Sequence, residues 1–232
     1  MKNLGALKRI KYDTAFAAIM RRETRLILAL DVISRSKALS LVQSLKGYFD
    51  AIKIGYPLIL SAGPLIIREI SDIAPVVADL KVADIPNTNR LICQAVLEKG
   101  ASAIIAHAFP GLDSLKACAD CARIYEADLF VVTEMSHPGA DLFMAPLARD
   151  LARMAVEVNA TGVVAPATKP DRIKLIRSII GERTIISPGI GIQGGSPIAA
   201  LAAGADYLIV GRSIIEAENP ASFIRKLISE IQ

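Results

Sequence analysis

The sequence has few cysteines, no long uninterrupted apolar run and no linker, and each absence removes a class of protein. Its 3 cysteines are an odd number that provides no disulfide framework. The longest stretch without charge, residues 184–205, is broken by glycine and proline, so we interpret it as a loop between short apolar segments and not as a membrane span. No Ser-rich, Pro-rich or low-complexity run marks a domain boundary.

Charge and the first residues narrow the location and the partners. Residues 1–13 carry charge throughout and lack the apolar core of a secretory signal, so we expect a cytoplasmic protein. The net charge is +4 and is dispersed along the chain, which argues against a nucleic-acid partner. It would suit a small anionic substrate, but an ordinary solvated surface is the better explanation.

The pair Cys118 and Cys121 forms a CxxC motif inside a segment that is typical of an amphipathic helix. No second pair of ligands follows it, and it does not open a helix after a strand. We therefore predict a structural role for both thiols and no zinc or redox site.

Short β-branched runs alternate with helical patterns along most of the chain. In the first helix, Ser36 is the predicted N-cap and apolar residues recur from Ala38 to Leu45. A last helix is expected from about Asn219 to the C-terminus. The predicted strands are Arg25–Asp31, Ala51–Pro57, Val76–Val82, Ser102–Ala108, Leu129–Met135, Gly162–Pro166, Thr184–Ile190 and Tyr207–Ser213.

Eight strand–helix units in 232 residues predict a TIM (β/α)8 barrel over residues 25–232. A doubly wound open sheet is the alternative, and the number of units argues against it. Residues 1–24 precede the repeat, and we expect them to form a helix that closes the bottom of the barrel.

Charged residues occur where the predicted strands end, which is where barrel enzymes carry their chemistry. Asp31 ends the first strand and Lys53 lies on the second. Asp79 and Lys81 lie on the third strand two residues apart, so that they share a face, and Asp84 follows in the loop. Because these residues come from separate strands and converge on one barrel mouth, we expect a functional cluster.

Alternating lysines and aspartates hold one another ionised, since a nearby opposite charge favours the charged form. A lysine between carboxylates stays protonated and becomes a positioned proton donor. If a substrate loses an anionic group as CO2, that lysine can stabilise the developing carbanion. The cluster is therefore compatible with a decarboxylation that uses no electron-sink cofactor.

A second cluster, residues 188–197 with sequence PGIGIQGGSP, follows the seventh strand. Glycines allow a backbone to approach an anion closely, and a short helix is expected next. Arg212 is predicted at the end of the eighth strand, where a guanidinium can hold a phosphate through two hydrogen bonds. TIM barrels frequently bind phosphate with these two loops, so we expect a phosphorylated substrate.

These motifs resemble the orotidine 5′-phosphate decarboxylase family, most closely its compact archaeal form. The resemblance runs from Arg25 to near the C-terminus, and its motifs are LALD, KIGYPL, DLKVADIPNT, TEMSHPGA, SPGIGIQGG and IVGRS. It implies a metal- and cofactor-free conversion of orotidine 5′-monophosphate to UMP and CO2 in pyrimidine biosynthesis.

The resemblance also implies roles for individual residues. Lys53, Asp79, Lys81 and Asp84 would form the catalytic network, in which Lys81 protonates C6 of the pyrimidine. Asp84 would come from the second subunit of a homodimer, and Ile85 and Thr88 would cross the interface with it. The remaining substrate contacts would be Asp31 and Lys53 to the ribose, Ser136 to the pyrimidine, and Gln193, Gly211 and Arg212 at the phosphate, with Pro188 as a further substrate-binding residue. The family pattern gives His107 and His137 no catalytic role, and we expect both to have a structural role or to support the residues of the site.

Two other interpretations stay open. A related barrel could act on a sugar phosphate as a Mg²⁺-dependent decarboxylase or aldolase, although Lys53 stands where such a site would need an acidic residue. A barrel that only binds a nucleotide is the other, although such a protein would gain nothing from carboxylates at the reacting position.

Overall fold

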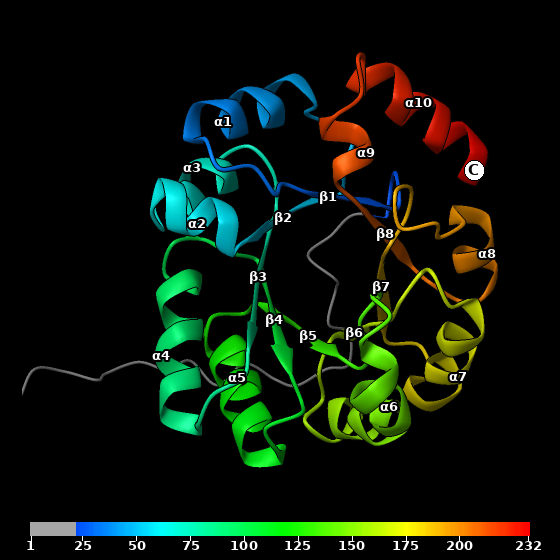
Figure 1. Cartoon of the computed structure of the whole chain (residues 1–232). Coiled ribbons are helices and arrows are strands. Elements are labelled where there is room, and N and C mark those ends of the chain that lie inside the picture. The colour runs from blue at the N-terminus through cyan, green and yellow to red at the C-terminus, as the bar shows by residue number, and fades with distance from the viewer. Residues whose placement is uncertain (1–21) are drawn as a thin grey trace, which may run out of the picture.

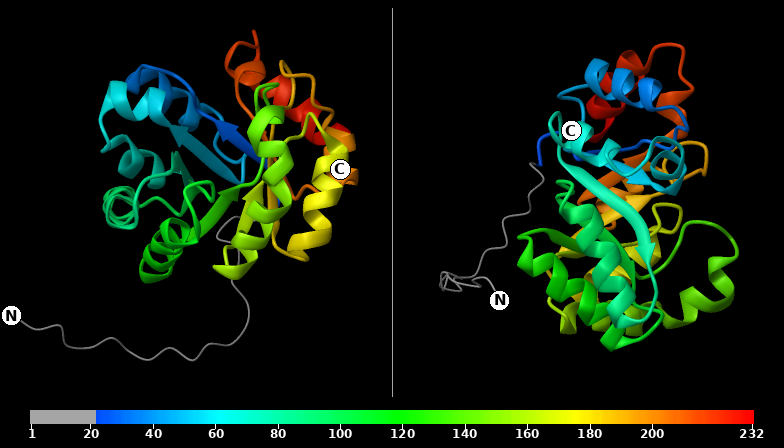
Figure 2. Two further views of the ribbon diagram at one scale, coloured as in Figure 1. Left: turned by 60° about the horizontal axis from the view of Figure 1, so that its bottom comes forward. Right: turned by 90° about the vertical axis from the view of Figure 1, so that its left-hand side faces the viewer.

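The computed structural model describes residues 22–232, and these form a closed barrel of eight parallel strands in the order β1 to β8. Figure 1 shows the strands inside a ring of helices, and the two further views in Figure 2 show the same arrangement from the side. The strands are β1 (Leu26–Ala29), β2 (Ala51–Gly55), β3 (Val76–Val82), β4 (Ala103–His107), β5 (Asp128–Val132), β6 (Gly162–Val164), β7 (Thr184–Pro188) and β8 (Tyr207–Val210). The predicted TIM barrel is confirmed, and most strands end earlier than predicted.

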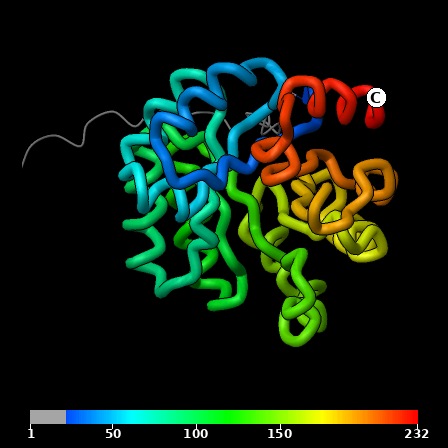
Figure 3. The backbone as a smooth tube through the Cα atoms, turned by 45° about the horizontal axis from the view of Figure 1, so that its top comes forward, coloured from blue at the N-terminus to red at the C-terminus, as the bar shows by residue number. Residues whose placement is uncertain are grey.

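The helices lie outside the strands, and the tube in Figure 3 shows them following one another around the barrel. They are α1 (Arg35–Ser44), α2 (Tyr56–Ala62), α3 (Ile66–Ser71), α4 (Pro86–Leu97), α5 (Leu112–Ile124), α6 (Ala140–Glu157), α7 (Pro170–Ile180), α8 (Pro197–Ala202), α9 (Arg212–Ile215) and α10 (Pro220–Ile231). Arg225 on α10 donates to the Tyr48 hydroxyl at 2.9 Å. This hydrogen bond joins the last helix to the loop that follows α1.

Two local predictions for the helices have different outcomes. The cap of α1 is Ser34 and not Ser36, because the Ser34 hydroxyl accepts from the Lys37 amide one turn into the helix. The final helix is confirmed, with Asn219 capping the Ser222 amide. The helix expected within residues 1–24 lies outside the described residues except for its last three, which are not helical.

Alternation along the strands divides the core into two apolar clusters. Leu26 and Leu28 of β1 point outward and join the large cluster between strands and helices. Ile27 and Ala29 point inward and join the smaller cluster that fills the barrel, with Phe130 and Tyr207 among its members. This period of two places the next inward residues, above the apolar layers, at the carboxyl ends of the strands.

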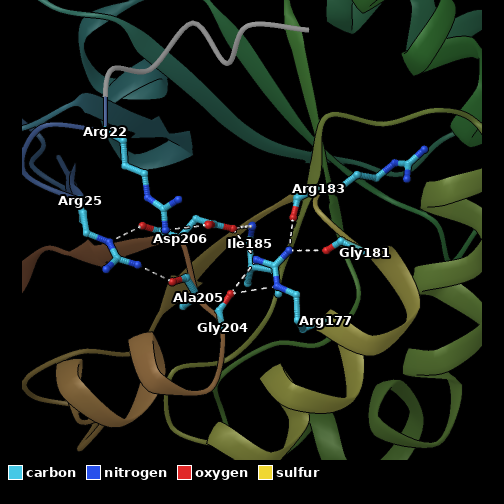
Figure 4. A network of polar contacts seen from close by, with 9 residues as sticks. All are labelled: Arg22, Arg25, Arg177, Gly181, Arg183, Ile185, Gly204, Ala205 and Asp206. Atoms are coloured by element: carbon cyan, nitrogen blue, oxygen red, sulfur yellow. Dashed lines mark hydrogen bonds and ion pairs between the residues drawn. The ribbon is translucent and has the colours of Figure 1, made fainter. Parts of the chain in front are cut away.

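The amino ends of β1, β7 and β8 are joined by a polar network around Asp206 (Figure 4). Its carboxylate pairs with Arg22 at 3.0 Å and with Arg177 at 2.5 Å, and it accepts from the Ile185 amide at 2.8 Å. Arg25 donates to the main-chain carbonyl of Asp206. The network lies at the end of the barrel opposite the predicted site, where residues contribute to stability and not to chemistry.

Candidate active site

A cavity of about 220 Å³ opens at the carboxyl ends of the strands. All but three of the predicted site residues line it, namely Asp31, Lys53, Asp79, Lys81, Ser136, Pro188, Gln193, Gly211 and Arg212. Sequence reasoning missed the apolar part of the lining, which includes Ile105, Val132, Met135, Val164 and Ile209. Most of these continue the inward-facing pattern of their strands, and that pattern is the signal that could have identified them.

Three of the four expected network residues, Lys53, Asp79 and Lys81, are in contact, and Asp31 adds a fourth charge to the row. The Lys53 ammonium lies 3.5 Å from Asp31 and 3.0 Å from Asp79, and the Lys81 ammonium lies 2.8 Å from Asp79. Lys53 and Asp79 are 8% and 7% exposed, so both charges are held away from bulk water. A buried carboxylate therefore sits between two ammonium groups, with alternating sign along the chain.

The pairing decides the ionisation of the buried groups. Burial alone would raise the pKa of Asp79, but the ammonium groups of Lys53 and Lys81 outweigh it and hold that pKa below its ordinary value. Burial would likewise lower the pKa of Lys53, but Asp79 and Asp31 outweigh it and the pKa is raised. Asp79 is therefore an anion and Lys53 a cation at neutral pH.

β3 is irregular around Lys81, which the sequence did not predict. The pairing of β3 with β4 shifts between Ala78 and Val82, and Lys81 has a positive φ of 45°. A non-glycine residue in the left-handed region costs roughly 1–2 kcal/mol, and such strain is common at functional sites. Asp79 and Lys81 nevertheless share a face, because the alternating residues Ala78, Leu80 and Val82 join the outer apolar cluster while both charged side chains line the cavity.

Asp84, Ile85 and Thr88 do not line the cavity. Asp84 accepts a hydrogen bond from the Ile85 amide at 2.7 Å, and the Ile85 side chain is 65% exposed. Thr88 lies in the first turn of α4. Within one chain Asp84 therefore lies outside the network, and its expected contribution to the neighbouring subunit's site stays a prediction.

The loop after β7 lines the cavity and contacts the start of α9. The Ile192 amide donates to the Ser213 hydroxyl at 3.3 Å, and the Gly194 amide donates to the Gly191 carbonyl at 2.7 Å. Gly191 has a φ of 80°, and a Cβ there would collide with the Ser213 hydroxyl. Arg212 was predicted at the end of a strand, but β8 ends earlier and Arg212 is the first residue of α9. Gln193 and Arg212 line the same cavity, as a binding site for an anionic group requires.

The loop after β5 carries Ser136. It also contains a buried carboxylate, that of Glu134, which the sequence analysis did not identify. Glu134 is fully buried and pairs with Lys169 at 3.0 Å and with Arg172 at 2.7 Å. The Thr168 hydroxyl donates to the Ser136 carbonyl at 3.4 Å. These contacts join the loops after β5 and β6 on one side of the cavity.

His107 lies on the inward face of β4, and burial followed by the charge of Lys81 lowers its pKa. Its Nδ1 is buried and has no hydrogen-bond partner among the described residues. A neutral imidazole beside the network fits the predicted supporting role and supplies no charge of its own.

The three cysteines are buried and unpaired, with Cys93 on α4 and the CxxC pair on α5. A hydrogen bond with Cys118 and burial raise the pKa of Cys93, so its thiol is held in the unreactive form. Among residues 22–232, no group of three or more His, Cys, Asp or Glu side chains is arranged to hold a metal ion. The same residues contain no helix that could span a membrane.

The fold and the site together define a (β/α)8-barrel enzyme with a charged cavity at the carboxyl ends of its strands. The chain belongs to the Orotidine 5′-phosphate decarboxylase / HUMPS family, whose model matches residues 24–227.

Several relatives are similar over nearly their whole length. The orotidine 5′-phosphate decarboxylase of Methanosarcina acetivorans is 57% identical over 92% of this chain and 97% of that protein. That of Pyrococcus furiosus is 46% identical over 89% of this chain and 97% of that protein. The structure of the Methanocaldococcus jannaschii orotidine 5′-monophosphate decarboxylase, complexed with the inhibitor BMP, has a TM-score of 0.85 at 44% identity and covers 89% of this chain and 98% of that one.

Proposed function

We propose that this enzyme decarboxylates orotidine 5′-monophosphate to UMP and CO2. The observation that carries the proposal is the Asp31–Lys53–Asp79–Lys81 chain of alternating charges beside a cavity that also holds Arg212. Relatives that carry the name orotidine 5′-phosphate decarboxylase and are 46–57% identical support the choice of substrate.

In the proposed reaction, the bond between C6 of the pyrimidine and the carboxylate breaks and CO2 leaves. The electron pair stays on C6, and the Lys81 ammonium donates a proton to it. Asp79 holds that ammonium 2.8 Å away and keeps it oriented, so the cation is in place when the carbanion forms. The product is UMP, and the next turnover requires Lys81 to regain a proton from water.

The other contacts position the substrate. Asp31 and Lys53 would bind the ribose hydroxyls. Ser136 and Pro188 would contact the base from the loops after β5 and β7. Gln193, the Gly211 backbone and Arg212 would hold the phosphate, and their shared position on the cavity wall supports this role.

We infer that the reaction needs no metal. Two ammonium groups lie within 3.0 Å of Asp79, and they would repel a divalent cation from that carboxylate. The test is an assay with orotidine 5′-monophosphate and excess EDTA that follows the loss of orotate absorbance, with a Lys81→Ala variant beside the parent. Fast loss in the parent and almost none in the variant is the expected result. Turnover that appears only when Mg²⁺ is restored would favour the sugar-phosphate chemistry instead.

We further propose that the enzyme is a homodimer in which Asp84, Ile85 and Thr88 complete the site of the neighbouring subunit. Exposed apolar side chains follow four consecutive strands at the barrel mouth, namely Ile33, Tyr56, Ile85 and Phe109, which are 77%, 50%, 65% and 57% exposed. Such a cluster is typical of an interface.

The shared site can be tested with mixed dimers. An Asp84→Ala chain paired with a Lys81→Ala chain has one complete site, so activity should return to up to half of the parent value. If isolated mixed dimers stay as inactive as either variant alone, the shared site does not exist.

A further inference from the structure

The main chain of Asp84 is held from both sides by side chains of two different helices. Its amide donates to Oδ1 of Asn89 on α4 at 2.8 Å. Its carbonyl accepts from the hydroxyl of Ser114 on α5 at 2.7 Å. Both polar groups of this one peptide position are therefore paired with side chains and not with a neighbouring strand or with a helix backbone.

The two side chains also hold each other. The Asn89 amide nitrogen donates to the Ser114 hydroxyl at 2.7 Å and to the Ser114 carbonyl at 3.1 Å. With Asp84 these contacts form a closed ring in which the hydroxyl accepts one hydrogen bond and donates another. The ring leaves the Asn89 amide a single orientation, because its oxygen faces a donor and its nitrogen faces acceptors.

The burial of the pair is unusual for its position. Asn89 is 0% exposed and Ser114 is 2% exposed, while the Asp84 side chain above them is exposed. Polar groups are costly to bury, and apolar residues would fill the space between two packed helices at lower cost. An exposed loop residue does not normally require two buried side chains to fix its backbone.

Fixing the backbone also fixes the direction of the carboxylate. The Asp84 side chain accepts from the next amide, that of Ile85, so its first torsion angle is restrained by local geometry. α4 and α5 pack against each other and hold the ring between them. Asp84 is therefore presented at a set position and angle at the edge of the molecule.

We propose that Asn89 and Ser114 are positioning residues that hold Asp84 ready to enter the neighbouring subunit's active site. The inference rests on the proposed shared site. It predicts that the damage from losing Asn89 appears in the partner's site and not in the site of the chain that carries the substitution. A purely structural role would damage the chain's own barrel first.

Mixed dimers made by co-expressing two differently tagged chains separate these cases. In a dimer of Asn89→Leu with Lys81→Ala, the one site with a lysine receives Asp84 from the chain that retains Asn89. In a dimer of Asn89→Leu with Asp84→Ala, only one site receives an aspartate at position 84, and that aspartate comes from the chain that carries Asn89→Leu. We expect kcat in the second dimer to be about 10- to 100-fold below the first, since misplacement by about 1 Å costs up to about 100-fold.

Ser114→Ala is the second variant, because it removes one hydroxyl and is less disruptive to folding. In the same two mixed dimers it should lower kcat of the second dimer relative to the first, by a smaller factor than Asn89→Leu. Thr161→Val is the matched control, because Thr161 also bonds through its hydroxyl, to Asp128 at 2.9 Å, but at the opposite end of the barrel. Thr161→Val paired with Asp84→Ala should retain the full activity of one site.

Equal kcat in the two Asn89→Leu dimers would overturn the proposal. Low activity in both would also overturn it, because that result means that Asn89 supports its own chain. The dimer of Asp84→Ala with Lys81→Ala distinguishes the inference from its foundation. If that dimer is inactive, the shared site itself fails, whereas if it is active the Asn89 result stands alone.

Discussion

Replacing Asp79 with asparagine should destabilise the protein through Lys53, in addition to abolishing activity. Lys53 is 8% exposed, and its ammonium has one buried counter-charge, Asp79, and one exposed one, Asp31. Asparagine has nearly the same shape as aspartate, so packing is kept and the charge alone is lost. The variant therefore isolates the electrostatic contribution of the carboxylate.

The expected size of the effect follows from the geometry. At 3.0 Å, the Lys53–Asp79 attraction is roughly 5–6 kcal/mol at an effective dielectric constant of 20. Removing one partner of a buried pair typically costs about 3–5 kcal/mol. Because Asp31 remains 3.5 Å from Lys53, we expect the lower end, a loss of about 3 kcal/mol in the free energy of unfolding at pH 7.

The loss should depend on pH with a definite sign. In the parent, the raised pKa of Lys53 means that its contribution is complete below about 10.5 and is lost only above that value. In the variant, burial acts with less opposition, so Lys53 is destabilising at pH 7 and the penalty fades as the pH rises toward 10.5. The difference between parent and variant should therefore shrink between pH 7 and pH 10.

Urea unfolding followed by far-UV circular dichroism at pH 7.0 and 9.5 measures this difference. The control is Asp79→Asn combined with Lys53→Met, which removes the unpaired charge and should recover at least half of the lost stability while activity stays lost. A variant as stable as the parent at pH 7, with no gain in the double variant, would refute the claim that Asp79 neutralises a buried Lys53.

Three further outcomes are expected. Arg212→Ala should raise KM about 10- to 100-fold with a smaller change in kcat, in steady-state assays, because one charged hydrogen-bond donor to the phosphate is lost; an unchanged KM would exclude Arg212 from the phosphate site. Asp50→Ala should lower the free energy of unfolding by about 2–3 kcal/mol in urea, because its buried carboxylate accepts from the amides of residues 23–25, and activity per folded molecule should not change. His107→Asn should reduce the loss in the free energy of unfolding as the pH falls from 6.5 to 5. The lowered pKa of His107 makes the unfolded state bind a proton preferentially in that range, and the variant lacks this group. Identical profiles of unfolding free energy against pH for parent and variant would contradict this.

The barrel and the centre of its site could be predicted because they depend on short-range periodicity. Inward-facing residues alternate along each strand, so a charge that continues the pattern, such as Lys53 or Asp79, must lie at the mouth. The strand count then fixes the closed sheet. Both inferences use only the residue types, their spacing within each strand and the number of strands.

The features that escaped prediction depend on contacts between distant segments or on exact backbone geometry. Glu134 is buried because Lys169 and Arg172, from the start of α7, reach it, and neither spacing nor residue type reveals that approach. The pair Asn89 and Ser114 is separated by 25 positions and meets only where α4 packs on α5. Arg212 begins a helix because β8 stops earlier than its apolar pattern suggests, and element boundaries are the least certain part of any sequence interpretation.

The irregular third strand has a consequence for engineering and for evolution. Between Ala78 and Val82 the third strand advances four residues while the fourth advances two, from Ile104 to Ala106. The two additional residues lie among Asp79, Leu80 and Lys81, which stand opposite Ile105 alone. A deletion of two consecutive residues between Ala78 and Val82 would restore regular pairing only by removing Asp79 or Lys81, because Leu80 is the one uncharged residue of the three, so the additional length cannot be removed without loss of the network. Conversely, transplanting residues 78–84 onto a regularly paired strand of another barrel would transfer the residue types. It would not reproduce the position of Lys81 unless the neighbouring strand allowed the same shift in register.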